Sequence, residues 1–194
     1  MKRPTELTTG KARLSFCHIL EPYVRPDDPS NTPKYSVTII IPKADRTTKA
    51  AIDRAYQFAV NEGIQQKWGG KKPALIACPI YDGDGVRPNG EPFGEECKGS
   101  WVLTASSKRK PLVVDAALQD IIDANEIYSG IYGKVGINFF AYYNAGKKGI
   151  GCGLNGVQKV ADGEALGGAA PKKAEDMFQP EAQLDPITGE AVPF

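Results

Sequence analysis

Residues 131–144 read IYGKVGINFFAYYN, and after the turn AGKKG at 145–149 residues 150–160 read IGCGLNGVQKV. In the first segment apolar residues recur at every second position as far as Phe139, which is the period of a strand with one face in a core. Two such segments joined by a glycine-containing turn predict a β-hairpin. We therefore expect these segments to pair, with Phe139 in the core.

The second segment of this hairpin includes GIGCGLNG at 149–156, which superficially resembles the G-x-G-x-x-G phosphate-binding loop. That loop opens a helix, whereas these glycines lie within a strand pattern, so nucleotide binding is disfavoured. Glycines inside strands more often mark strong bends or the close approach of another backbone. We expect one of these two roles here.

Three further segments have the composition and alternation of strands. They are residues 11–20, KARLSFCHIL; residues 35–41, YSVTIII; and residues 101–106, WVLTAS. In the first, one face is expected to carry Ala12, Leu14, Phe16 and Leu20. In the second, one face is expected to carry Tyr35, Val37, Ile39 and Ile41.

The segments between these strands differ in character. The proline-rich stretch EPYVRPDDPSNTP predicts a long loop, and residues 71–100 predict an irregular excursion with at most one short strand. Residues 113–130 predict a connector with one short helix. A longer amphipathic helix is expected to start at a cap on Asp45 or Thr47 and to stop at Gly69-Gly70.

About five principal strands with a helix inserted between them favour a mainly-β fold over an alternating α/β sheet. The architecture that fits is a five-stranded OB-type Greek-key barrel with an inserted α-helix. We assign this domain to residues 1–168. Residues 169–194, rich in Gly, Ala, Pro and acids, are expected to form a disordered acidic tail ending in Phe.

Charge is segregated along the chain. All 24 Lys and Arg lie at or before Lys173 together with 18 of the 23 acids, so that part carries +6 and the remainder carries −5. A basic body with an acidic tail suggests a polyanionic ligand and an internal competitor for it. A tail that merely keeps the protein soluble is the alternative.

Several classes of protein are disfavoured by composition. No apolar run is long enough for a signal peptide or a membrane helix, which predicts a cytosolic protein. The four cysteines lie far apart without a C-x-x-C pair, so we expect reduced, mostly buried thiols and no zinc site. The only histidine, His18, is a poor catalytic base and is expected to be structural.

Carboxylates between Asp82 and Glu96 offer an enzymatic alternative. Asp82, Asp84, Glu95 and Glu96 can in principle form the metal site of a nuclease, since such sites need clustered carboxylates. The DGDG sequence at 82–85 lacks the remaining ligands of a calcium loop and is read as a turn. A third alternative is a structural protein that assembles through its sheet edges.

Basic residues at loop ends and aromatic residues in the adjoining strands favour binding of single-stranded nucleic acid, because cations neutralise phosphates while rings stack on bases. The expected phosphate contacts are Arg25, Lys34, Lys108, Arg109, Lys110, Lys147 and Lys148. The expected stacking residues are Trp101, Tyr132, Tyr142 and Tyr143, with a place in the core as the alternative for Trp101 and Tyr132. Tyr35 faces either the core or the groove, depending on a register that the sequence leaves open. In an OB barrel the ligand crosses strands two and three.

The blocks PKYSVTIIIPK, SSKRKPLVVD, the hairpin from Tyr128 to Val160 and the following DGEALGG resemble a phage family long catalogued as a domain of unknown function. The resemblance covers residues 11 to about 168. It implies an OB-fold single-stranded DNA-binding protein that acts in the cytoplasm of the infected bacterium, in replication or recombination. It implies no cofactor and no enzymatic activity.

The end of the chain, EAVPF, resembles the acidic, aromatic-terminated tails of bacterial and phage single-strand binders. Those tails dock on replication and recombination proteins. The resemblance implies that Glu190, Pro193 and Phe194 take part in such docking, although this tail is less densely acidic than the family pattern. The tail can also compete with DNA for the basic groove at high effective concentration.

Overall fold

The computed structural model describes residues 3–24, 32–167, 183–184 and 191–192. Within these ranges the strands are β1 (Glu6–Thr8), β2 (Ala12–Tyr23), β3 (Lys34–Pro42), β4 (Ile80–Asp82), β5 (Ser100–Ser107), β6 (Leu112–Val114), β7 (Tyr132–Asn144), β8 (Lys147–Ala161), β9 (Gln183–Leu184) and β10 (Ala191–Val192). The helices are α1 (Arg46–Gln66) and the short 3₁₀ turns η1 (Glu95–Cys97) and η2 (Ala124–Glu126). No helix in these ranges is both long and apolar enough to cross a membrane.

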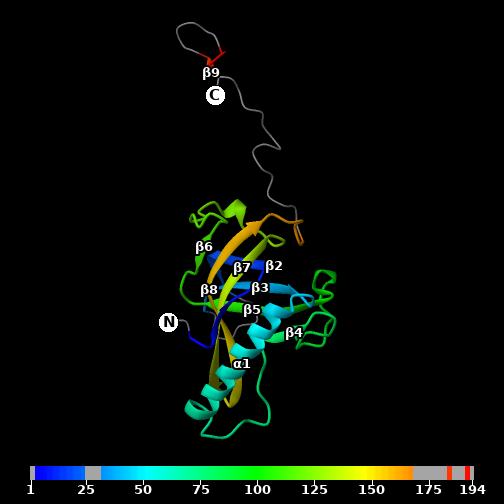
Figure 1. The fold of residues 1–194 in the computed structure, drawn as a ribbon, viewed down its shortest axis with the longest axis vertical. Helices are drawn as coiled ribbons and strands as arrows, with labels where there is room; N and C mark the ends of the chain where they lie inside the picture. The colour runs from blue at the N-terminus through cyan, green and yellow to red at the C-terminus, as the bar shows by residue number, and fades with distance from the viewer. Residues whose placement is uncertain (1–2, 25–31, 168–182, 185–190, 193–194) are drawn as a thin grey trace.

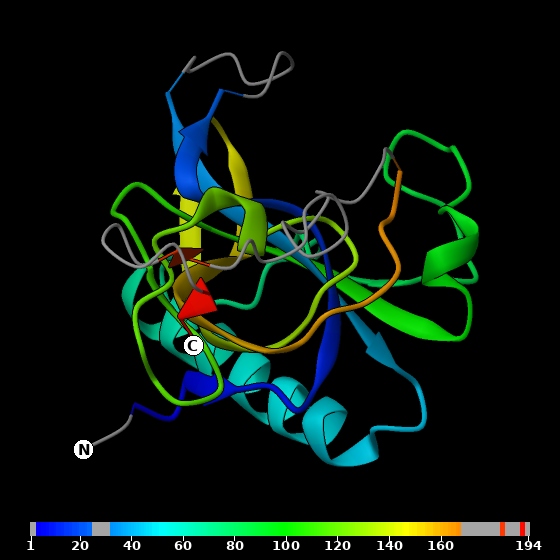
Figure 2. The ribbon, with the colours of Figure 1, turned by 90° about the horizontal axis from the view of Figure 1, so that it is seen from above.

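The five long strands close into a barrel. β2 pairs with β3, β3 with β5, β5 with β8, β8 with β7, and β7 again with β2. All of these pairs are antiparallel except β5–β8, which is parallel. Seen from above, the strands curve around a common centre (Figure 2). The fold is therefore the predicted OB-type barrel, extended by the short strands β1, β4 and β6.

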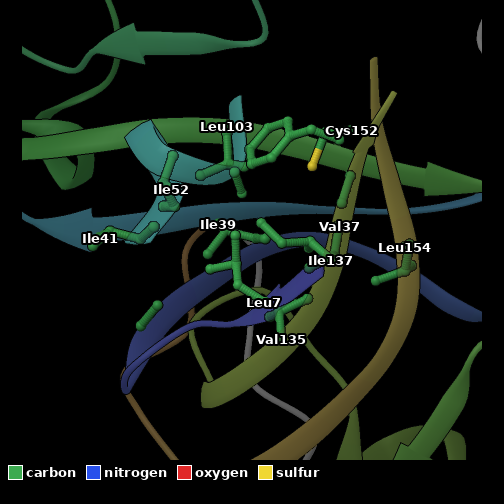
Figure 3. Packing of buried hydrophobic residues seen from close by; sticks show 14 of the residues in the cluster. Leu7, Val37, Ile39, Ile41, Ile52, Leu103, Val135, Ile137, Cys152 and Leu154 are labelled. Atoms are coloured by element: carbon green, nitrogen blue, oxygen red, sulfur yellow. The ribbon is translucent and has the colours of Figure 1, made fainter. Parts of the chain in front are cut away.

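The hairpin predicted from residues 131–160 is confirmed as β7–β8 and is the longest ladder of the sheet. Its two-residue turn, Ala145-Gly146, has positive φ at both positions, as a type I′ turn requires. Phe139 is buried, as expected. Figure 3 shows Ile137 of this hairpin meeting Val37, Ile39 and other apolar side chains inside the barrel.

The predicted helix is confirmed as α1, and Asp45 rather than Thr47 caps it, accepting a hydrogen bond from the Thr48 amide at 3.0 Å. Ile52, Ala55 and Ala59 are buried and turn the apolar face of α1 toward the barrel. Figure 1 shows α1 running beside the lower part of the β7–β8 hairpin. The helix thus covers one region of the barrel, chiefly against β7.

One expectation about β2 is wrong. Phe16 does not share the buried face of Ala12 and Leu14 but is 60% exposed, and Ile19 is buried in its place. The reason is a bulge: the β2–β3 register shifts between Ser15 and His18, and Phe16 has a φ of +48°. The extra residue turns the following side chains to the other face of the sheet.

The loops also differ in part from the expectation. β2 continues through Pro22 to Tyr23 because the ladder with β3 is already interrupted there, so the missing proline N–H costs no regular bond. The 113–130 connector begins within the strand β6 and holds η2, a 3₁₀ turn rather than an α-helix. Residues 71–99 hold one short strand, β4, as predicted, together with η1.

The segment after β8 is anchored to the barrel as far as Leu166, whose amide donates a hydrogen bond to the Ser129 carbonyl at 2.7 Å. The Lys159 ammonium is buried and pairs with Glu126 and, at 2.9 Å, with Asp162. Burial opposes its charge, but the hydrogen bonds to these two carboxylates raise the Lys159 pKa.

The expected disordered tail, 169–194, lies outside the described residues except for β9 and β10, which pair with each other. Its disorder stays a prediction.

Candidate nucleic-acid interface

A groove of about 410 Å³ lies on the outer surface of the barrel, between the β5–β6 turn and the β7–β8 hairpin. We call it the wall groove. Its lining residues are Ser106, Ser107, Arg109, Lys110, Asn138, Phe140, Gly153, Leu154 and Asn155. It thus combines two cations, one aromatic ring and small polar groups.

Phe140 is exposed because it follows the buried Phe139 in a strand, where successive side chains point to opposite faces. Its ring lies over Gly151, its partner on β8. A Cβ added at Gly151 would lie 2.5 Å from Phe140 Cζ, so the ring occupies the space that a β8 side chain would fill. Phe140 as a residue is 46% exposed, so its ring is available for stacking.

The cations of the wall groove come from the β5–β6 turn, the basic turn predicted from the sequence. Arg109 and Lys110 line the groove, and Lys108 precedes them in the same turn. Lys34, at the start of β3, lies near this turn because its neighbour Tyr35 pairs with Ser107. Four of the predicted phosphate contacts are therefore gathered at one end of the β3–β5 pair.

The outer face of β3 and β5 beside the groove carries hydroxyl groups. Ser36 pairs with Ser106 and Thr38 with Thr104, and the two threonine hydroxyls are 3.0 Å apart. Tyr35 points the other way and packs against the core, which is one of the two orientations that the sequence left open.

Beyond Thr38 and Thr104, the outer face of β3 and β5 is covered by other residues. Ile40 and Val102, the next outward pair of β3 and β5, are buried with Cys97 and contact Phe93. These covering residues belong to the irregular segment between β4 and β5. The path across strands two and three of the barrel is therefore open at the hydroxyl end and closed at the other.

A second set of predicted residues lies at the tip of the β7–β8 hairpin. Tyr143 is 59% exposed, and the Lys148 ammonium lies 5.5 Å from the centre of its ring. Lys147 is exposed beside the turn. Tyr142 is half-buried, and its carbonyl accepts a hydrogen bond from the Trp68 indole at 3.1 Å.

The remaining aromatic candidates lie elsewhere. The Trp101 ring packs against the core, with the Lys43 and Lys49 ammonium groups 5.1 and 4.6 Å from its centre. Tyr132 lies near the start of β7, and its ring is faced by Lys11 and Arg13. The structure thus does not bring Trp101 and Tyr132 together with Phe140.

Four predicted residues fall outside the described ranges. They are Arg25, Glu190, Pro193 and Phe194.

Three of the four carboxylates proposed for a nuclease form ion pairs with lysines. The Lys43 ammonium lies 2.6 Å from Asp82 and 2.7 Å from Asp84, and its hydrogen bonds hold the pKa of both carboxyl groups below the usual range. Glu95 pairs with Lys98 at 2.7 Å. Over the described ranges, no three His, Cys, Asp or Glu residues gather closely enough to hold a metal ion.

The sequence analysis placed Phe139 in the core and did not name Phe140 as a binding candidate. Strict alternation from the buried Phe139, with a glycine-rich partner strand opposite, was a signal that could have found it. The exposure of Phe16 could not be predicted in this way, since it results from a β-bulge rather than from regular alternation. The glycines of 149–156 were expected to mark strong bends or the close approach of another backbone. At Gly156 a Cβ would lie 3.1 Å from the Leu112 carbonyl oxygen, whereas at Gly151 it is the ring of Phe140 that approaches.

Comparison with known proteins decides the family. A family model described as the single-stranded DNA-binding protein of Enterobacter phage Enc34 matches residues 5–188. The chain belongs to this family. A solved structure of the Enc34 protein in complex with single-stranded DNA shares 28% identity, covers 84% of this chain and 90% of its own, and has a TM-score of 0.71. Protein p50 of Acyrthosiphon pisum secondary endosymbiont phage 1 is 27% identical over 88% of this chain and 91% of its own length.

A more distant structure shares the architecture of the Enc34 family. The single-stranded DNA-binding protein gp2.5 of bacteriophage T7 has a TM-score of 0.56 at 16% identity, covering 91% of this chain and 98% of its own. At that identity the likeness concerns the fold. The Enc34 family consists of DNA-binding proteins rather than enzymes, so the nuclease alternative is not retained.

Proposed function

We propose that this chain binds single-stranded DNA with little sequence preference, and that the wall groove is part of its binding surface. The observation that carries the proposal is the exposed Phe140 ring lying over Gly151 beside Arg109 and Lys110. The cations neutralise phosphates and the ring stacks on a base, and each stacked base contributes about 1–3 kcal/mol. Stacking needs only the π-face that every base has, so it does not select a sequence.

In the cell, we propose that the protein coats and protects single-stranded DNA during phage replication and recombination, in the cytoplasm of the infected bacterium. Residues 1–168 form the binding domain, and residues 169–194 form the acidic tail. The tail competes with DNA for the basic surface or recruits partner proteins through Glu190, Pro193 and Phe194. The separation of −5 after Lys173 from +6 before it supports the competing role.

Fluorescence anisotropy of labelled oligo-dT and of a matched duplex tests the proposal, at two salt concentrations, with the full chain and with a version ending at Lys173. We expect preference for the single strand, tighter binding at low salt, and tighter binding still without the tail. No preference for the single strand in either version contradicts the function. Unchanged affinity after truncation contradicts only the competing tail.

A further inference from the structure

The outer face of the β7–β8 hairpin has an unusual composition. On β8 its outward positions are Gly149, Gly151 and Gly153, which have no side chains. Their partners on β7 are Tyr142, Phe140 and Asn138 in the same order. One strand of the hairpin therefore supplies all the side chains of this stretch, and the other supplies a bare backbone.

The β7 side chains lie across these glycines. A Cβ at Gly149 would lie 2.5 Å from the Tyr142 hydroxyl oxygen, one at Gly151 would lie 2.5 Å from Phe140 Cζ, and one at Gly153 would collide with the Asn138 amide. The two rings are two residues apart on one strand, which is a spacing of about 7 Å. We call this row of side chains over glycines the ladder.

The ladder connects two basic regions. At Asn138 and Phe140 it forms part of the wall groove, beside Arg109 and Lys110. At the other end it reaches the hairpin turn, six residues beyond Asn138 and about 20 Å away at the rise of a strand. Figure 1 shows this end of the hairpin next to the C-terminal end of α1.

Lysines from two separate parts of the chain gather at that end. The loop after α1 is held there by the Trp68–Tyr142 hydrogen bond and by the pairing of Ala77 with Gly149. The residues that we call the tip patch are Lys67, Lys71, Lys72, Lys147 and Lys148. The first four are exposed, and Lys148 is half-buried. No sequence pattern linked the loop lysines with those of the hairpin.

We propose that single-stranded DNA runs lengthwise along the hairpin, from the wall groove over the ladder to the tip patch, with bases on Phe140 and Tyr142. This inference rests on the proposed function. It differs from the path across strands two and three that an OB barrel suggests. On that face the surface is open at Thr38 and Thr104 and is covered beyond them, at Ile40 and Val102.

The stacking step is tested by Phe140→Ala, with Phe58→Ala as the matched control. Phe58 lies on α1 and is 44% exposed, against 46% for Phe140. We expect Phe140→Ala to weaken oligo-dT binding about 5- to 150-fold, the equivalent of one stacked base, and Phe58→Ala to leave it unchanged. Equal affinities of the two variants overturn the stacking step.

Gly151→Val tests the ladder without removing a ring. The new side chain occupies the space of the Phe140 ring and tilts it out of the ladder, so we expect weaker binding with the melting temperature close to that of the parent. If Gly151→Val unfolds the protein, Phe140→Ala still decides the point. A folded Gly151→Val variant with full affinity contradicts the ladder.

The double variant Lys71→Ala with Lys72→Ala tests whether the DNA follows the hairpin lengthwise. Its binding is measured with oligo-dT of about 4 and of about 16 nucleotides, which are the limits of the site size of one OB fold. The short strand fills the wall groove alone, whereas the long one reaches the tip patch. We expect loss of affinity for the long strand only. The slope of the logarithm of the binding constant against the logarithm of the salt concentration should become shallower by about 0.7 for each lost phosphate contact.

The double variant Arg46→Ala with Arg54→Ala is the control, since both arginines are exposed on α1 away from the tip. Loss equal to that of the control, or equal loss for both strand lengths, overturns the lengthwise path. Failure of the unaltered protein to bind either strand contradicts the proposed function itself, so the two failures are distinguishable.

Discussion

Phe16 and Phe140 are both exposed aromatic residues of the barrel surface, but different physical causes expose them. Phe140 follows from regular alternation in β7 and keeps ordinary strand geometry. Phe16 is exposed by a bulge and has a φ of +48°, a region that costs a non-glycine residue about 1–3 kcal/mol. Phe16 therefore carries strain that Phe140 does not.

Substitution of Phe16 by glycine measures this strain. Glycine adopts positive φ without cost, so we expect Phe16→Gly to raise the free energy of unfolding by about 1 kcal/mol. Phe58→Gly, in the middle of α1, should lower it by about 1 kcal/mol, because glycine is a poor helix former. Urea denaturation of both variants provides the measurement, and a loss of stability in Phe16→Gly contradicts the strain.

The four cysteines are free in the structure, and their environments differ. Burial raises the pKa of Cys17 to about 12 and that of Cys97 to about 11, and it raises the pKa of Cys152 further. Cys78 is exposed. Because the thiolate is the reactive form, we expect iodoacetamide at pH 8 to label Cys78 first and the other three only on unfolding. Mass spectrometry of the intact and digested protein checks the order, and early labelling of Cys152 contradicts the burial.

Among the elements, α1 shows how a helix is positioned by its first turn. Asp45 caps the helix through the Thr48 amide, and the Thr48 hydroxyl accepts a hydrogen bond from the Gly10 amide at 2.8 Å. A Cβ at Gly10 would lie 2.5 Å from the Asp45 carboxylate, so glycine is needed for this approach. The cap therefore fixes the start of α1 against the segment between β1 and β2.

Removal of the cap should cost stability in a pH-dependent way. We expect Asp45→Ala to lower the free energy of unfolding by about 0.5–2 kcal/mol at pH 7. Hydrogen bonds from Thr48 lower the Asp45 pKa in the folded protein below 3.8, so this contribution is present above pH 3.8 and is lost as the pH falls through the folded-state value. Urea denaturation at pH 7 and at decreasing acid pH checks this, and a difference that stays constant with pH contradicts the charged cap.

At the scale of the whole molecule, closure of the barrel gives β3 a hydrogen-bonded neighbour on each side, β2 and β5. The segment between β4 and β5 has fewer contacts with the barrel: it contains the isolated bridge from Val86 to Pro92, and Asp84 forms an ion pair with Lys43. The barrel should therefore unfold as one unit, whereas this segment can open locally.

Hydrogen exchange distinguishes these two regions. We expect the amides of Val37 and Ile39 to exchange only through global unfolding, and those of residues 86–91 to exchange many times faster. Exchange followed by NMR at increasing low denaturant concentrations provides the test. Protection of residues 86–91 equal to that of β3 contradicts a separately opening segment.

Local patterns determined much of this protein. The five long strands, the helix from Asp45, the hairpin turn and the burial of Phe139 follow from periodicity and turn chemistry, which act over a few neighbouring residues. The basic turn at Lys108–Lys110 was visible for the same reason. Tertiary structure alone decided the exposure of Phe16 and the ion pairs of Asp82 and Asp84 with Lys43. It also decided the attachment of the loop that carries Lys71 and Lys72 to the β7–β8 hairpin. These depend on strand register and barrel closure, which bring together residues far apart in the chain, and no local pattern encodes such distances.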